Sequence, residues 1–423
     1  MSEDLWARLG FASSPYDVRA ISPSKRGDEL LVGRDDELRT LKAQITSSSL
    51  HPCLDGENGV GKTSLVAVAG YQLKKDFARE PGSPAFLPVE RVFQLTEGVT
   101  FDAFSIDVAR EIAKAFLLYR SELDSAGFSV PTFDELSSWV DHGSGTEAFG
   151  RGLRSTVESW LARCFPTPQS GGFICTLDNL ELLKSSAQVR NALEEMRDGV
   201  LSWPGLRWVL CGSRGIVRFG TSSTRLEGRL ATPLTIEPLS PTVMPMLIAR
   251  RIAAFRIAPR AVAPVQSSGF KYIYDVLHDN LRNALRYADD FSVRMFVDRL
   301  PPADVDDCDG LLRGWLAREG RQVVNAVDAQ IGADDWQILE KIGELGGSAS
   351  TKLFEELSFT SAKALRPHLA ALERVGVLSA VVRDGDRRLK NLEVTPRGWL
   401  ALHSRSAVTA LPSAATRPLG ELE

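Results

Sequence analysis

Eight consecutive residues, 56–63, constrain the fold of this chain more than any other segment. They match every fixed position of the phosphate-binding pattern G-x-x-x-x-G-K-[ST]. Glycines in such a loop let successive backbone N–H groups turn toward a phosphate, in conformations that a Cβ would obstruct. Lys62 is expected to reach the β- and γ-phosphates, and Thr63 to offer its hydroxyl to Mg²⁺. The alternative is a glycine-rich turn with a solvated lysine. The predicted nucleotide contacts are Gly56, Glu57, Asn58, Gly59, Val60, Gly61, Lys62, Thr63 and Ser64.

The segments that flank this loop have the character that a phosphate loop requires. Residues 50–54 are mostly apolar and resemble a buried strand, with Pro52 near its start, where a missing N–H is tolerated. Residues 64–69 resemble a helix, whose positive dipole end would point at a bound phosphate. The sequence therefore predicts ATP or ADP with Mg²⁺ as cofactors.

Between residues 50 and 238, short apolar segments alternate with helical ones. Their near-continuous apolarity is typical of parallel strands that helices cover on both faces. We therefore expect an α/β fold, with a P-loop NTPase core in which a parallel sheet lies between helices. The predicted strands are 50–54, 91–95, 173–177, 207–211 and 234–236.

Changes in composition and periodicity divide the rest of the chain. Phe11 and Tyr16 are candidate anchors of the N-terminal lead-in, and a helix is predicted over 35–45. The Pro/Ser/Ala-rich tail is expected to be disordered. The predicted parts are a lead-in (1–30), a nucleotide-binding core (31–240), a helical lid (241–300), a linker helix (301–330), a C-terminal module (331–405) and the tail (406–423).

Composition restricts the class of protein further. The net charge of −4 does not indicate a nucleic-acid partner, so any such site must be local. The five cysteines are scattered without metal-site spacing, which favours a reducing cytoplasm over a disulfide framework. The chain lacks a signal-peptide pattern and an apolar run of membrane-spanning length, so we expect a cytoplasmic protein without a membrane partner.

An acidic residue follows the predicted strand 173–177 and completes the metal site. Asp178 stands where a Walker B carboxylate would hold the water shell of Mg²⁺, although it could also begin the next helix as a cap. The next residue is Asn179, where many ATP-hydrolysing proteins carry glutamate. An amide cannot accept a proton, so we expect slow hydrolysis. Glu181 could replace that glutamate only if the turn brings it inward.

Two further places could report the state of the nucleotide. Ser213 and Arg214 follow the predicted strand 207–211, where a polar side chain could sense the γ-phosphate or simply cap the strand. Arg282, near a helix start in the predicted lid, could reach the phosphates through charge-assisted hydrogen bonds, or could be a solvated surface residue.

Together, these motifs resemble the AAA+ ATPases, and among them the origin-recognition-complex-like initiators and their bacterial relatives, over about residues 11–405. The resemblance implies that Val32, Gly33 and Arg34 line the adenine pocket and that Arg282 is sensor 2. It also implies self-assembly through an arginine finger, for which Arg225 and Arg229 are candidates or merely surface charges. The STAND signalling ATPases share the motif at Arg214. Those proteins normally carry long repeat sensors, which this sequence does not lead us to expect here.

The C-terminal module reads as three helices followed by a hairpin. Helices are expected over 335–342, 351–357 and 361–375, and strands over 378–382 and 389–394, joined by an Asp-Gly turn. This order resembles a winged helix-turn-helix domain, which could place helix 361–375 in the DNA major groove or could dock a protein. The candidate DNA contacts are Lys363, Arg366, Arg374, Arg383, Arg387, Arg388 and Lys390.

These observations predict an ATP-binding molecular switch with slow ATPase activity that contacts double-stranded DNA through its C-terminal module. The first alternative is a STAND-like signalling or antiviral-defence ATPase whose winged helix binds a protein partner. The second is an ATP-dependent assembly helper in transposition or replication.

Overall fold

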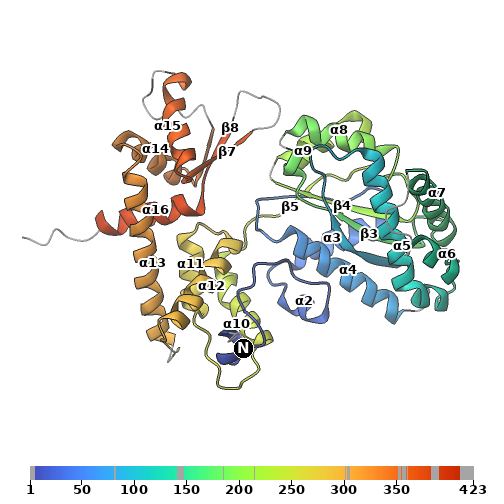
Figure 1. Ribbon diagram of the computed structural model, residues 1–423, viewed down its shortest axis with the longest axis horizontal. Coiled ribbons are helices and arrows are strands. Elements are labelled where there is room, and N and C mark those ends of the chain that lie inside the picture. The colour runs from blue at the N-terminus through green and yellow to red at the C-terminus, as the bar shows by residue number, and fades with distance from the viewer. Residues whose placement is uncertain are drawn as a thin grey trace, which may run out of the picture. The chain divides into compact units, whose positions relative to one another are not determined.

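The structure is a computed structural model that describes residues 5–80, 82–140, 147–183, 185–213, 215–300, 302, 305–350, 354, 359, 361–382 and 390–409. The chain folds into two compact units (Figure 1). One unit comprises Val18–Ala254, and the other combines Met1–Asp17 with Phe255–Glu423.

The first unit is built on a five-stranded sheet in the order β2-β3-β4-β1-β5, and all four neighbouring pairs are parallel. The register places Asp55 beside Gly212 and Leu177 beside Leu210, so the strands of the phosphate loop and of the acidic motif end at the same edge. The predicted parallel α/β sheet is confirmed. The strands are β1 (Cys53–Asp55), β2 (Ala85–Phe93), β3 (Gly171–Leu177), β4 (Leu206–Gly212) and β5 (Leu234–Thr235).

One strand prediction was misplaced. The strand expected over 91–95 begins at Ala85 and ends at Phe93. Its pairing with β3 shifts register between Pro88 and Val92, and its residues 90–92 are exposed. Pro88 and the exposed residues 90–92 interrupt the apolar pattern of this strand, so its pattern alone predicts a later start than the structure has.

Helices cover both faces of this sheet, as the apolar strands predict. On one face, α3 and α4 supply Leu41 and Leu65 to a core with Leu54. On the other, α5, α7 and α8 close a larger core that contains Phe93 and Trp208. The helices of this unit are α2 (Lys25–Leu30), α3 (Asp35–Ser47), α4 (Lys62–Arg79), α5 (Phe101–Ser125), α6 (Phe133–Val140), α7 (Glu147–Cys164), α8 (Ser186–Arg197), α9 (Ile216–Thr221) and α10 (Met244–Phe255), with 3-10 turns η1 (Leu180–Leu183), η2 (Thr224–Leu226) and η3 (Pro241–Val243).

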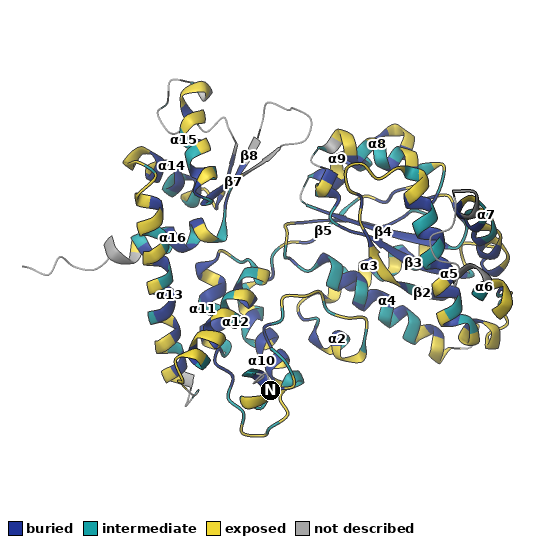
Figure 2. Cartoon of the chain, in the orientation of Figure 1, coloured by how far each residue is buried: buried dark blue, intermediate teal, exposed yellow. Residues whose placement is uncertain are grey.

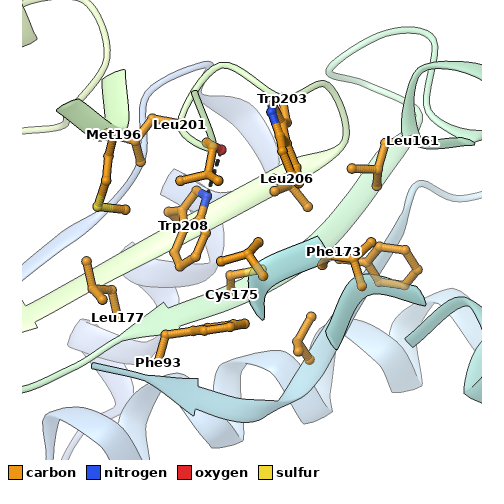
Figure 3. Packing of buried hydrophobic residues seen from close by; sticks show 14 of the residues in the cluster. Phe93, Leu161, Phe173, Cys175, Leu177, Met196, Leu201, Trp203, Leu206 and Trp208 are labelled. Carbon is orange, nitrogen blue, oxygen red and sulfur yellow. Dashed lines mark hydrogen bonds between the residues drawn. The ribbon is translucent and has the colours of Figure 1, made fainter. Parts of the chain in front are cut away.

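The packing of the larger core is tight and aromatic. Figure 2 shows the strands of the sheet as buried, with exposed residues on the outward faces of the surrounding helices. In Figure 3, Trp208 of β4 lies over Cys175 and faces Phe93 of β2, and the two ring centroids are 5.4 Å apart. The indole N–H of Trp208 donates to the carbonyl of Val200 at 2.9 Å, so this buried polar group is satisfied.

The second unit contains a helical part and a C-terminal module. Phe11 and Tyr16, the candidate anchors of the lead-in, are fully buried in it. The C-terminal module combines helices with an antiparallel sheet of order β6-β8-β7. The elements are α1 (Leu5–Arg8), α11 (Ser267–Val276), α12 (Leu281–Val297), α13 (Val305–Asp328), α14 (Ala333–Glu344), β6 (Ser348–Ser350), α15 (Ala362–Arg374), β7 (Leu378–Val382), β8 (Lys390–Val394) and α16 (Pro396–Thr409).

Four elements that the sequence predicts for the C-terminal module are present, namely α14, α15, β7 and β8, whereas β6 and α16 were not predicted. Trp336, Leu365 and Leu392 join α14, α15 and β8 in one core. The hairpin β7–β8 is present, while its turn (383–389) and most of the expected helix over 351–357 lie outside the described residues. Within the described ranges, no helix is long and apolar enough to cross a membrane.

Candidate nucleotide-binding site

The phosphate loop has the backbone geometry that its glycines predict. Gly59 and Gly61 have φ values of 91° and 100°, in the left-handed region that glycine adopts without strain. A Cβ on Gly56 would collide with the carbonyl oxygen of Ile236. The loop therefore needs glycine at these three positions, and α4 begins immediately after it at Lys62.

The ammonium group of Lys62 lies folded over the loop. Its Nζ donates to the carbonyls of Gly56 at 2.8 Å and Glu57 at 3.0 Å, and the residue is only 7% exposed. These carbonyls keep the buried charge satisfied, as a buried ammonium requires. An anion bound in the loop could take their place as the partner of this charge, so the geometry suits a phosphate.

The predicted metal ligands meet at one point. Thr63 Oγ1 donates to Asp178 Oδ2 at 2.5 Å, which joins the first turn of α4 to the end of β3. The other carboxylate oxygen, Asp178 Oδ1, accepts the backbone N–H of Asn179 at 2.8 Å. A hydroxyl and a carboxylate are the hard oxygen ligands that Mg²⁺ takes beside nucleotide phosphates. The residues present therefore fit a nucleotide-bound magnesium ion.

The turn after Asp178 brings Glu181 inward. Asn179 has a φ of 57°, a left-handed conformation that asparagine tolerates better than most residues. The following turn, η1, places Glu181 so that its Oε2 accepts the backbone N–H of Ser213 at 3.1 Å. The carboxylate of Glu181 therefore lies against the segment that follows β4, and its role as a substitute base remains a prediction.

The side chain of Ser213 does not cap the strand. Its Oγ is buried and has no hydrogen-bond partner within the described part of the chain. A buried hydroxyl without a partner is uncommon and indicates a ligand or a water molecule as its missing partner. Arg214, the other candidate in this motif, lies outside the described residues.

Two predicted nucleotide contacts are engaged with the protein backbone. Arg34 donates through Nη2 to the carbonyls of Val60 at 3.1 Å and Glu237 at 2.6 Å, and it is 6% exposed. Ser64 Oγ accepts the N–H of Ile21 at 3.0 Å, which fastens the lead-in to α4. Both side chains therefore hold the walls around the loop together, and their predicted contact with nucleotide remains a prediction.

Of the remaining residues of the predicted adenine pocket, Gly33 lies against the segment before α10. Val32 is buried, and Gly33 has a φ of 70°. A Cβ on Gly33 would come within 3.0 Å of Val243 Cγ1. Both residues belong to the same unit as the phosphate loop, and their predicted contact with adenine remains a prediction.

The other candidate residues lie outside the phosphate loop and outside the segments that follow β3 and β4. Arg225 is paired with Glu194 at 3.0 Å and is 57% exposed, while Arg229 is exposed four residues later. Arg282 is an exposed residue at the start of α12, in the second unit.

Among the DNA candidates, Lys363, Arg366 and Arg374 are exposed on α15, and Lys390 begins β8. Arg383, Arg387 and Arg388 lie outside the described residues.

The sequence did not single out Asp55 or Arg218. Asp55 is buried at the end of β1 and forms an ion pair with Arg218 of α9, with 3.1 Å between Oδ2 and Nε. One signal was available, because an acidic residue ends an otherwise apolar strand directly before Gly56.

Comparison with known proteins finds similar solved structures but no match to a protein family or to a curated sequence. Among solved structures, the Aeropyrum pernix ORC1 protein in complex with DNA is 16% identical, with 91% of this chain and 97% of that chain covered and a TM-score of 0.42. The Aeropyrum pernix ORC2 protein in its ADPNP–ADP complexes is 11% identical, with 94% and 97% covered and a TM-score of 0.48.

A further similar structure is a Walker-type ATPase of Pyrococcus abyssi, which is 14% identical, with 92% of this chain and 99% of that chain covered and a TM-score of 0.46. The chain is thus similar to origin-recognition proteins and a Walker-type ATPase along most of its length. At these identities and at TM-scores below 0.5, the likeness assigns no role to this chain. The parallel sheet and its phosphate loop make the first unit a P-loop NTPase core.

Proposed function

We propose that this chain is an ATP-dependent switch that binds ATP with Mg²⁺ around the phosphate loop and hydrolyses it slowly. The observation that carries the proposal is the 2.5 Å hydrogen bond from Thr63 to Asp178, beside the phosphate loop. The ammonium group of Lys62 is hydrogen-bonded to the loop carbonyl of Gly56. When ATP is bound, Lys62 would turn from the loop carbonyls to phosphate oxygens, and Thr63 and Asp178 would hold the metal. The metal ion neutralises charge that develops on the phosphates.

Slow hydrolysis follows from the residues available as a base. Asn179 cannot accept a proton from an attacking water molecule, and its carboxylate neighbour Glu181 is held by the N–H of Ser213. Glu181 is the candidate base, because its carboxylate binds the residue that follows β4, and β4 ends beside Asp55, directly before the phosphate loop. The hydrogen bond from Ser213 occupies Oε2, which leaves Oε1 as the oxygen that would accept the proton.

The proposed contact with DNA rests on one face of α15. Lys363, Arg366 and Arg374 are exposed, and spacings of three and eleven residues return them to one side of an α-helix with 3.6 residues per turn. Leu365, Leu369 and Leu372 are buried on the opposite side, against the core of the module. A helix that presents cations outward and is packed from behind suits binding of phosphates and base edges in the major groove.

Fluorescence anisotropy of the full-length chain on duplex DNA tests this proposal, in a salt series with MgATP, with MgADP and without nucleotide. We expect affinity that falls with salt and that changes with the nucleotide. The double variant Lys363→Ala/Arg366→Ala should bind more weakly. Arg294→Ala is the matched control, because Arg294 is an exposed cation of the same unit, paired with Asp298 at 2.7 Å. No binding at low salt under any nucleotide condition would contradict the DNA contact.

A further inference from the structure

Asp55 is a buried carboxylate immediately before the phosphate loop. Its side chain is 1% exposed, and Asp55 Oδ2 lies 3.1 Å from Nε of Arg218. Its second oxygen, Oδ1, accepts the backbone N–H of Gly215 at 3.0 Å. Burial of a carboxylate is costly unless it is paired and hydrogen-bonded, and the other residues of β1, Cys53 and Leu54, are apolar. The ion pair with Arg218 and the hydrogen bond from Gly215 offset this cost.

The ion pair joins three elements at the carboxyl edge of the sheet. Besides its bond to Asp55, Arg218 donates through Nη2 to Thr235 Oγ1 at 2.5 Å. Asp55 ends β1, Arg218 belongs to α9, and Thr235 ends β5. The first turn of α9, which follows the segment after β4, is thereby fastened to the strand that leads into the phosphate loop.

Ser213 and Gly215, which follow β4, are each held by a carboxylate. Glu181 accepts the N–H of Ser213 at 3.1 Å, and Asp55 accepts the N–H of Gly215 at 3.0 Å. Between these two anchors, the Oγ of Ser213 is buried without a protein partner within the described residues. The position of this hydroxyl relative to the phosphate loop is therefore set by two carboxylates, one after β3 and one at the end of β1.

We infer that Asp55, through its ion pair with Arg218, is a positioning residue that makes the site distinguish a nucleoside triphosphate from a diphosphate. This inference rests on the proposed nucleotide site. Lys62 and the loop N–H groups can hold a diphosphate without the ion pair, whereas contact of the Ser213 hydroxyl with a terminal phosphate would require Ser213 and Gly215 to keep their positions relative to the loop. Loss of the ion pair should therefore weaken binding of the triphosphate selectively.

Calorimetric titration of the full-length chain tests the inference, with MgADP and with the Mg²⁺ complex of a non-hydrolysable β,γ-imido ATP analogue. In Arg218→Gln and in Asp55→Asn, affinity for the triphosphate analogue should fall roughly tenfold, while ADP affinity should stay within about twofold. Arg218 is 59% exposed, so its replacement should leave the fold intact, which a melting curve checks. Arg218→Lys keeps the charge and should restore part of the preference.

Arg91→Gln is the matched control. It breaks an ion pair with Asp107, at 2.6 Å, in which the arginine is 45% exposed, and it should change neither affinity. The double variant Asp55→Asn/Arg218→Gln should lose little more than either single variant, because both act through one pair.

Equal losses for both nucleotides, fully additive losses in the double variant, or an unchanged preference in Arg218→Gln would overturn the positioning role. A wild-type chain that binds the triphosphate no better than ADP would also overturn it. A wild-type chain that binds neither nucleotide would instead overturn the proposed function.

Discussion

The phosphate-loop site and the basic face of α15 (Lys363, Arg366 and Arg374) differ in how their charged side chains are exposed to water. Around the loop, Lys62 and Asp178 are each 7% exposed, and each is hydrogen-bonded to neighbouring groups of the protein. On α15, Lys363, Arg366 and Arg374 are exposed. One region holds its charges in fixed positions before any ligand arrives, while the other leaves them in water.

This difference predicts how each region should respond to mutation. A buried charge that loses its partner is left unsatisfied, so a single change in the loop site should have a large effect that salt hardly alters. Exposed cations contribute separately and modestly, and salt screens them. The predictions below test this contrast, in order of decreasing effect.

The largest effect should come from the proposed base. Glu181→Gln should lower ATP turnover about 10²–10⁴-fold, because a glutamine cannot accept the proton from water. The wild-type rate should already lie well below about 10 s⁻¹, a typical enzymatic value, and Asn179→Glu should raise it. Phosphate release measures all three. Glu195→Gln, an exposed glutamate on α8, is the control, and a Glu181→Gln variant as fast as wild type would exclude this base.

The metal site should come next. Asp178→Asn should weaken the Mg²⁺-dependent part of ATP binding by about 1.5–3 kcal/mol, because it removes a charged ligand beside Thr63. Titration of ATP with and without Mg²⁺ separates this part from binding to the loop alone. If affinity without Mg²⁺ fell just as far, Asp178 would support the fold and not the metal.

The proposed DNA contacts should show smaller effects, and the effect of each residue should be measurable by itself. Arg366→Ala should cost about 1–3 kcal/mol if Arg366 contacts a guanine edge, and should relax sequence preference. Replacing Arg387 and Arg388 together should weaken binding similarly on all sequences and reduce the slope of log affinity against log salt by about 1.8, since each phosphate contact contributes about 0.9. Anisotropy across a salt series measures both, and unchanged slopes would exclude these arginines as phosphate contacts.

The smallest effect concerns His51, which is buried just before β1. Its ring lies 2.8 Å from the carbonyl of Leu201, and burial lowers the pKa of His51 to about 4. Unfolded chains protonate histidine below about pH 6.5, so the unfolding free energy should fall as pH drops from 6.5 toward 4. Between pH 7.5 and 5.5 the loss should be about 1 kcal/mol.

Urea unfolding of wild type and His51→Gln at both pH values tests this effect. The variant should lack this part of the pH dependence. An identical pH dependence in the two proteins would contradict a neutral, buried His51.

The features that could be predicted from the sequence depend on residues that are close together in the chain. The phosphate loop, the helix after it and the acid after β3 lie within short segments, where glycine spacing and apolar runs carry the information. The sequence missed contacts between distant residues. Asp55 and Gly215 are 160 residues apart, and Arg34 reaches the carbonyl of Glu237 across 203 residues. No local pattern indicates that Arg34 supports the wall of the site, or that Asp55 is paired inside the sheet.

The most direct test of the central claim is calorimetric titration of MgATP into wild type and Lys62→Ala. The account predicts that the wild type binds MgATP and that the variant, folded by its melting curve, shows no binding or a greatly weakened affinity. Lys74→Ala, a cation farther along α4, should bind as the wild type does. Equal affinities of wild type and Lys62→Ala would contradict the nucleotide site, and with it the switch built on it.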